Sequence, residues 1–65
     1  SDDAVLRRVL LRHLTESQRE CVILRNEEEL SLDEIAVRTG KPKNSVKTNI
    51  SAARRRMLEE LKKMI

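Results

Sequence analysis

An all-α fold, with four helices in one compact domain and a helix-turn-helix toward its C-terminal end, is predicted by three observations. Apolar residues recur at spacings of three and four, the period of a helix face. Thr15 and Ser31 are each followed three residues later by Gln or Glu, which is the signature of a helix start. The single glycine and single proline, Gly40 and Pro42, mark a short turn between two helices.

The first helix is expected over residues 3–13, with a cap from Ser1 or one of the aspartates beside it. Its apolar residues form a broad face that should pack against the other helices: Val5, Leu6, Val9, Leu10 and Leu11. His13, near the end, is expected to face the helix dipole and solvent.

The second helix is expected over residues 16–28. Thr15 and Gln18 form a capping box, and Glu16 adds negative charge to the first turn. Its inner side should carry Cys21, Val22 and either Leu24 or Arg25. Cys21 is interpreted as a small core residue, because no second cysteine could pair with it.

The third helix is expected over residues 32–39. Ser31 and Glu34 form its capping box, and Leu30 can pack on Ile35 as a hydrophobic staple. The helix should end where Gly40 passes through the left-handed region, which costs glycine little.

The fourth helix, over residues 43–63, is the long recognition helix of the predicted motif. Pro42 suits its first turn because proline has a fixed φ and no N–H to donate. One apolar stripe is formed by Val46, Ile50, Ala53, Met57 and Leu61. Six basic residues and no acidic one lie between positions 41 and 56, although the whole chain is only +3. Charge segregated in this way is the electrostatic footprint of a nucleic-acid-binding element.

Composition excludes several classes of protein. With no aromatic residue, base stacking on aromatic platforms is impossible, which favours a DNA duplex over single-stranded nucleic acid. One Cys and one His do not suffice for a zinc site, and one Gly does not make a phosphate-cradling loop, so we expect no catalytic residue, metal or cofactor and no enzyme. No signal peptide or membrane span is visible, which favours a cytoplasmic protein without a membrane partner.

Three segments in order resemble region 4 of bacterial RNA polymerase sigma factors of the sigma-70 family, especially the extracytoplasmic-function group. They are LTESQRECVILR, LSLDEIAVRTG and NSVKTNISAARRRMLEEL. The resemblance covers about residues 10–61. It implies that the chain, 1–65, is a single domain and a fragment of a longer sigma factor.

The resemblance also implies partners: double-stranded promoter DNA at the minus-35 element, and RNA polymerase core through the flap of its β subunit. It leaves room for an anti-sigma factor. The residues that match DNA-contacting positions of the family are Lys43, Asn44, Lys47, Thr48, Ser51, Arg54 and Arg55.

Side-chain chemistry suggests which of these residues would contact bases and which would contact phosphates. Lys can donate to guanine and Asn can pair with adenine in the major groove, so Lys47 and Asn44 are expected to contact bases. Lys43, Arg54 and Arg55 would mainly neutralise phosphates, while Thr48 and Ser51 could contact either.

Two departures from the family pattern matter. Ser51 and Ala52 stand where relatives often carry aromatic or basic side chains, so the promoter sequence does not carry over. Glu29 replaces the glycine often found before this Leu-Ser, so the turn there is expected to differ in shape.

Two other functions compete. LuxR-type or other activator domains share the Ser-x-x-Glu-Ile-Ala and Val-Lys-Thr patterns, but here residues 20–31 are one position longer than their usual spacing. A helical protein-interaction module without DNA binding would instead present Leu58 and the tail from Leu61 to Ile65 to a partner.

Overall fold

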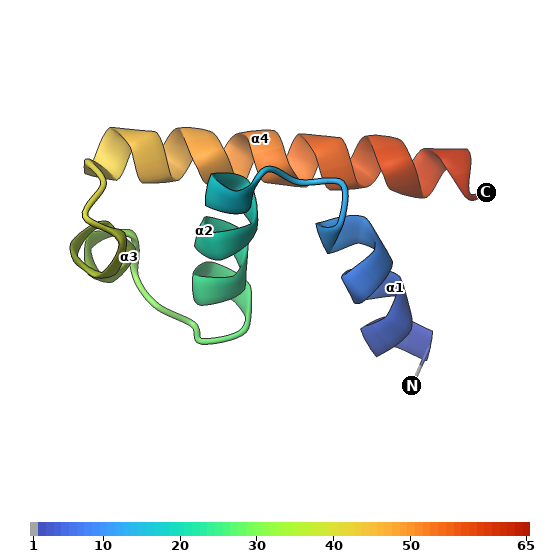
Figure 1. Cartoon of the computed structure of the whole chain (residues 1–65), viewed down its shortest axis with the longest axis horizontal. Coiled ribbons are helices and arrows are strands. Elements are labelled where there is room, and N and C mark those ends of the chain that lie inside the picture. Colours follow the sequence, from blue (N-terminus) through green and yellow to red (C-terminus); the bar gives the residue numbers. More distant parts are fainter. Residues whose placement is uncertain (1) are drawn as a thin grey trace.

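The protein is all-helical, as predicted, and a computed structural model describes residues 2–65. Within that range there are four helices and no strand: α1 (Asp2–Leu11), α2 (Glu16–Asn26), α3 (Leu32–Thr39) and α4 (Lys43–Lys63). Because α4 has 21 residues, it is about 31 Å long. The molecule measures 36 × 21 × 15 Å, so α4 runs nearly its full length, with the other helices along one side (Figure 1). The cap expected at Ser1 lies outside the described residues.

The main core joins α2, α3 and the first half of α4. Cys21, Ile35 and Val46 have no solvent exposure, and Leu24 and Ile50 complete the buried cluster. Leu24, rather than the exposed Arg25, is therefore the inward residue that the sequence left open. Burial raises the pKa of the Cys21 thiol, partly offset by the charge of Lys41, so the thiol stays neutral as a core residue.

A second, smaller cluster lies where the turn after α1 meets α2 and the middle of α4. Its buried members are Leu14, Val22 and Ala53, with Leu11 and Met57 packed against them. Among residues 3–11 of α1 only Leu10 is buried, while Val5 is 59% and Leu6 37% exposed. The prediction that the whole apolar face of α1 packs on the other helices is therefore wrong for its first half.

Both capping boxes form as predicted. The Thr15 hydroxyl accepts from the Gln18 N–H at 3.2 Å, and the Gln18 side chain accepts from the Thr15 N–H at 3.1 Å. In α3 the Ser31 hydroxyl accepts from the Glu34 N–H at 3.1 Å, and Glu34 Oε1 accepts from the Ser31 N–H at 2.8 Å. These bonds lower the pKa of Glu34, the Ser31 N–H having the largest effect, because they favour its charged form.

Helix α1 ends two residues earlier than the predicted residue 13. The N–H groups of Arg12, His13 and Leu14 each bond three residues back, which tightens the chain into a turn. The Arg19 guanidinium donates to two carbonyls there, that of Leu11 at 3.0 Å and that of Leu14 at 3.1 Å. A side chain of α2 thus donates to the last carbonyl of α1 and to a carbonyl of the turn that follows it.

Helix α2 also ends two residues before the predicted residue 28. After the helix the chain passes through Glu29, whose φ of 56° lies in the left-handed region. The Leu30 N–H then donates to the Leu24 carbonyl at 3.1 Å. Glu29 therefore adopts a backbone conformation that favours glycine, at a steric cost that glycine would avoid.

The apolar stripe of α4 is confirmed for Val46, Ile50 and Ala53, all buried. Beyond Met57 the most buried position is Glu60, 6% exposed, whereas the predicted Leu61 is half-buried. Glu60 thus continues the inward face of the helix with a charged side chain, and its partners are described below.

Candidate DNA-binding surface

The turn between α3 and α4 sets the direction of the recognition helix. Gly40 is left-handed, with φ 71°, and its N–H donates to the Ala36 carbonyl at 2.9 Å. Pro42 is the N-cap of α4 rather than a residue of its first turn, and its carbonyl accepts the first helical bond, from the Val46 N–H. The short turn and the buried Val46 together fix α4 against α3.

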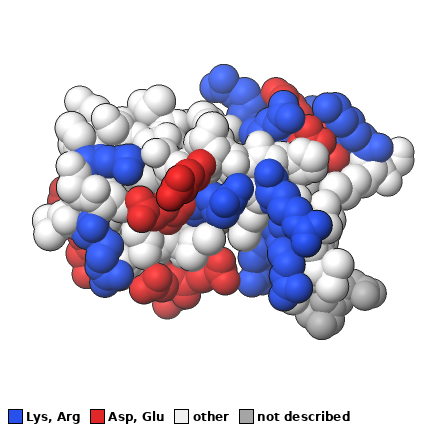
Figure 2. Space-filling view, in the orientation of Figure 1, with Lys and Arg blue, Asp and Glu red and all other residues white. Residues whose placement is uncertain are grey.

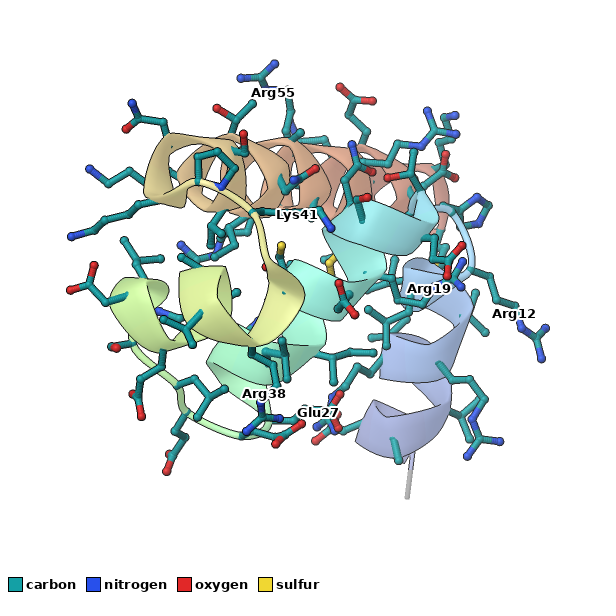
Figure 3. The ribbon with its side chains drawn as sticks, turned by 60° about the vertical axis from the view of Figure 1, so that its left-hand side comes forward. Arg12, Arg19, Glu27, Arg38, Lys41 and Arg55 are labelled. Carbon is teal, nitrogen blue, oxygen red and sulfur yellow. The ribbon has the colours of Figure 1, made fainter. Side chains whose placement is uncertain are left out.

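The first half of α4 presents an exposed outer face. All seven residues predicted to contact DNA lie at exposed positions of this helix: Lys43, Asn44, Lys47, Thr48, Ser51, Arg54 and Arg55. Figure 3 shows Arg55 extending from α4 away from the other helices. Five of them, Lys47, Thr48, Ser51, Arg54 and Arg55, line two adjoining hollows, while Lys43 and Asn44 lie nearer the start of the helix.

These side chains differ in whether they already form hydrogen bonds or ion pairs within the protein. The Thr48 hydroxyl donates to the Asn44 carbonyl at 3.0 Å, so its proton is engaged within the helix. Lys43 Nζ lies 3.2 Å from Asp33 Oδ1, and this ion pair joins the starts of α3 and α4. Contact of Lys43 with a phosphate would require it to leave or share that carboxylate.

Three other cations of this helix have no such partner. No acidic side chain of residues 3–65 lies within 4.0 Å of Lys47, Arg54 or Arg55. By contrast, Arg56 pairs with Glu60 at 3.1 Å, and Lys41 with Glu20 at 3.7 Å. Unpaired cations beside one another repel, and an anionic ligand relieves that repulsion.

Two shallow hollows lie on this surface and share Lys47 and Ser51. One has a volume of about 280 Å³ and is lined by Lys47, Thr48, Ser51, Ala52 and Arg55. The other, about 290 Å³, lies toward the end of α2 and the start of α3. The small side chains of Ser51 and Ala52 keep the outer face open, where a larger residue would fill it.

The neighbouring face, over α2 and α3, has a different electrostatic character. Figure 2 shows acidic side chains beside basic ones on the face it presents. Glu27 pairs with Arg7 at 3.6 Å and Glu28 with Arg38 at 3.8 Å. Opposite charges paired in this way produce no field of a single sign, so they do not attract a polyanion as the outer face of α4 does.

One charged cluster was missed by sequence reasoning. Glu60 accepts from Lys63 Nζ at 3.3 Å, and it lies 3.1 Å from Arg56 and 3.7 Å from His13. Burial alone would raise the pKa of Glu60, but Lys63, His13 and Arg56 together hold it below its ordinary value. His13 is exposed, as expected, and its imidazole also links the turn after α1 to Glu60 of α4. The signal was available: Glu60 follows Met57 at the spacing of three that continues the stripe.

Comparison with known families identifies the domain. The family described as Sigma-70, region 4, matches residues 8–57, from within α1 to the middle of α4. The chain belongs to the sigma-70 region 4 family. Region 4 domains are DNA-binding parts of sigma factors and interact generally with promoter DNA and RNA polymerase core. Comparison with curated proteins and with solved structures gave no match.

Sigma-70 region 4 is a DNA-binding regulatory family rather than an enzyme family. Among residues 3–65 no three His, Cys, Asp or Glu side chains gather as they would around a metal ion. None of the four helices has the length and apolar character needed to cross a membrane.

Proposed function

We propose that this region 4 domain binds the minus-35 element of promoter DNA through the outer face of α4 while it docks on the flap of the RNA polymerase β subunit. It would do so in the cytoplasm, as part of a sigma factor of the extracytoplasmic-function type. The observation that carries the proposal is the set of unpaired cations, Lys47, Arg54 and Arg55, on the exposed side of a helix fixed by its buried side.

The geometry supports recognition of the major groove, which admits one α-helix. Asn44, Lys47 and Ser51 recur at spacings of three and four, so they lie along one line of the outer face. Lys47 can donate to guanine, Asn44 can pair with adenine, and Ser51 can contact either base. Arg54 and Arg55, further along the helix, would neutralise phosphates and fix the register of the helix in the groove.

The test of base recognition uses a randomised duplex library, because the promoter sequence is unknown. The wild-type domain should enrich a short motif, and Lys47→Ala should relax the preference at one position by about 1–3 kcal/mol. Asn44→Ala should relax a neighbouring position. Arg12→Ala is the matched control, since it removes an exposed cation on the turn after α1. If the motif is unchanged in both α4 variants while the fold persists, the assigned reading face is wrong.

Docking on the polymerase needs a different surface. An apolar hollow of about 270 Å³ lies between α1 and the second half of α4, lined by Leu10, Asn26, Arg54, Met57, Leu58 and Leu61. Leu58 is 52% exposed there, and Val5 and Leu6 on α1 are exposed as well. Exposed apolar side chains beside a hollow are typical of a protein-binding site, and we assign this one to the β flap.

The docking test is a pull-down of the β subunit from a nuclease-treated bacterial lysate. The wild-type domain should recover β, and Leu58→Glu should lose it while keeping DNA binding. Val37→Glu is the matched control, because Val37 is 85% exposed on α3, outside the hollow. If β is not recovered although the domain binds DNA, the domain acts as an activator of the LuxR kind. If neither β nor DNA is bound, a protein-interaction module remains.

A further inference from the structure

The recognition helix begins with a cation whose charge is balanced from the helix before it. Lys43, the first residue of α4, has its Nζ 3.2 Å from Oδ1 of Asp33, which lies in the first turn of α3. Within residues 3–65, Asp33 is the only acidic residue whose carboxylate lies within 4.0 Å of Lys43. The first turn of α4 has no acidic residue of its own, and Pro42 supplies no side-chain cap. The negative charge beside the start of α4 therefore comes from α3.

We propose that Asp33 keeps Lys43 from neutralising a DNA phosphate, and so confines the phosphate contacts of the recognition helix to its later cations. The inference rests on the proposed function and deepens it, because it names a residue that sets how strongly the same surface attracts DNA. Asp33 is a positioning residue, since it acts through Lys43. The later cations, Lys47, Arg54 and Arg55, have no carboxylate within 4.0 Å among residues 3–65.

Both ends of this ion pair are attached to backbone that the fold holds in place. Asp33 lies between Ser31 and Glu34, whose capping box fixes the first turn of α3. Lys43 lies three residues before Val46, which has no solvent exposure and holds the start of α4 in the main core. With both backbones fixed, formation of the pair restricts only the two side chains, which is the entropic cost of an exposed ion pair.

The helix dipoles favour the same pairing. The N-terminus of a helix carries a partial positive charge, which attracts an anion and repels a cation. Asp33 is therefore stabilised at the start of α3, and its carboxylate offsets the unfavourable position of Lys43 at the start of α4. A phosphate that approaches Lys43 meets the Asp33 carboxylate, whose side chain is 78% exposed, and is repelled by it.

The pair leaves the start of the recognition helix without net charge. Asn44 and Ser45, which follow Lys43, are exposed and uncharged. Phosphate contacts fix the position of a protein on the duplex but carry no sequence information. A neutral start therefore leaves Asn44 in a part of α4 where base contacts, rather than attraction to the backbone, contribute to binding.

The test compares Asp33→Asn with the wild-type domain in binding to a labelled short duplex, followed by fluorescence anisotropy between about 50 and 200 mM salt. The substitution keeps the size of the side chain and removes its charge, so that Lys43 becomes free for a phosphate. Affinity at the low-salt end should rise, and the slope of log affinity against log salt should steepen by up to about 0.9, the contribution of one phosphate contact. Over this range of salt, affinity should then fall up to about 3.5-fold more than for the wild type.

A double variant shows whether Asp33 acts through Lys43. In a Lys43→Ala background, Asp33→Asn should leave the slope unchanged, and Lys43→Ala alone should have little effect on the wild-type slope. The matched control is Glu16→Gln, which removes an exposed carboxylate from the first turn of α2. Glu16 has no cation within 4.0 Å among residues 3–65, so its loss frees no lysine and should leave the slope unchanged.

The outcomes separate this inference from the proposed function. If Asp33→Asn lowers affinity or leaves the slope unchanged, while Lys47→Ala and Arg55→Ala weaken binding, the DNA-binding surface stands and the role of Asp33 is wrong. A steeper slope that persists in the Lys43→Ala background also overturns the inference, because Asp33 would then act without Lys43. So does a changed base preference of Asp33→Asn in the randomised library, since a freed phosphate contact carries no sequence information. If none of the variants alters DNA binding, both the inference and the proposed function are wrong.

Discussion

The two halves of this domain are built differently. In the half formed by α2, α3 and the first part of α4, Cys21, Ile35 and Val46 are fully enclosed and both capping boxes close. In the other half, α1 and the second part of α4 leave Val5 and Leu58 more than half exposed. The difference teaches that the core is concentrated behind the first half of α4, while apolar surface at the other end stays exposed.

The helices of the two halves are also held against α4 to different extents and by different contacts. Packing of α4 is most extensive on α2, then on α3, and least on α1. The charged contact between the turn after α1 and α4 is that of His13 with Glu60 at 3.7 Å, and Arg56 and Lys63 pair with Glu60 within α4 itself. Such contacts are weaker than apolar burial where solvent screens them, so we expect the α1 half to open more readily.

The largest expected loss of stability comes from Ile35→Ala, which leaves a cavity in the enclosed half. Loss of a buried isoleucine to alanine costs about 2–5 kcal/mol, against a total stability of roughly 3–5 kcal/mol for a domain of this size. Urea unfolding followed by circular dichroism should show little native protein. Val5→Ala, in the open half, should change stability by less than about 0.5 kcal/mol. Similar losses at both sites would contradict the comparison.

A smaller loss of stability is expected from Gly40→Ala, because the turn of the helix-turn-helix needs a positive φ at this position. A Cβ at this position meets no atom within 4 Å, so the cost of Gly40→Ala is conformational rather than steric crowding by neighbours. The left-handed conformation costs a non-glycine residue about 1–2 kcal/mol. Thermal melts should show a destabilisation of that size, and an unchanged midpoint would mean that the turn adapts without strain.

A gain in stability, rather than a loss, is expected on replacing Glu29, the non-glycine residue with φ 56°. Glu29→Gly relieves about 1–2 kcal/mol of backbone strain, while the extra freedom of glycine in the unfolded chain offsets about 0.5–1 kcal/mol of it. We therefore expect a net gain of roughly 0.5–1 kcal/mol in urea unfolding. Glu29→Ala removes the same charge and keeps the strain, so it should not stabilise the domain.

The smallest effect is expected at Glu60, which stabilises the open half. Because its pKa is lowered in the folded chain, its contribution is present above the ordinary carboxyl pKa of the unfolded chain. The contribution is lost as the pH falls through the lowered pKa. Glu60→Gln should reduce stability at neutral pH and flatten the decline toward acid. Amide exchange should place that change in the turn after α1, and an equal change throughout α3 would contradict the comparison.

Much of the enclosed half could be predicted because local chemistry decides it. Thr15, Ser31 and Gly40 act through neighbours a few residues away, so capping rules located the starts of α2 and α3 and the end of α3. The stripe through Val46, Ile50 and Ala53 gave the buried face of α4 for the same reason. The predicted DNA-contacting residues are exposed together, and their contacts with DNA stay a prediction.

The parts that were not predicted depend on residues distant in the sequence. Helix α1 ends at Leu11, where Arg19 of the next helix donates to its last carbonyl. No pattern within residues 3–13 specifies that end. The contact of Glu60 with His13 joins two residues far apart in the sequence. Asp33 could be placed beside Lys43 only once α3 and α4 were seen together.

One side chain, Arg54, borders both the cationic hollow beside the recognition helix and the apolar hollow between α1 and α4. A protein that moves Arg54 when it enters the apolar hollow changes the affinity of the other hollow for an anion by some factor. By thermodynamic linkage, the anion must change the affinity for that protein by the same factor. If both hollows bind their proposed ligands, Arg54 would make the two binding events cooperative or competitive.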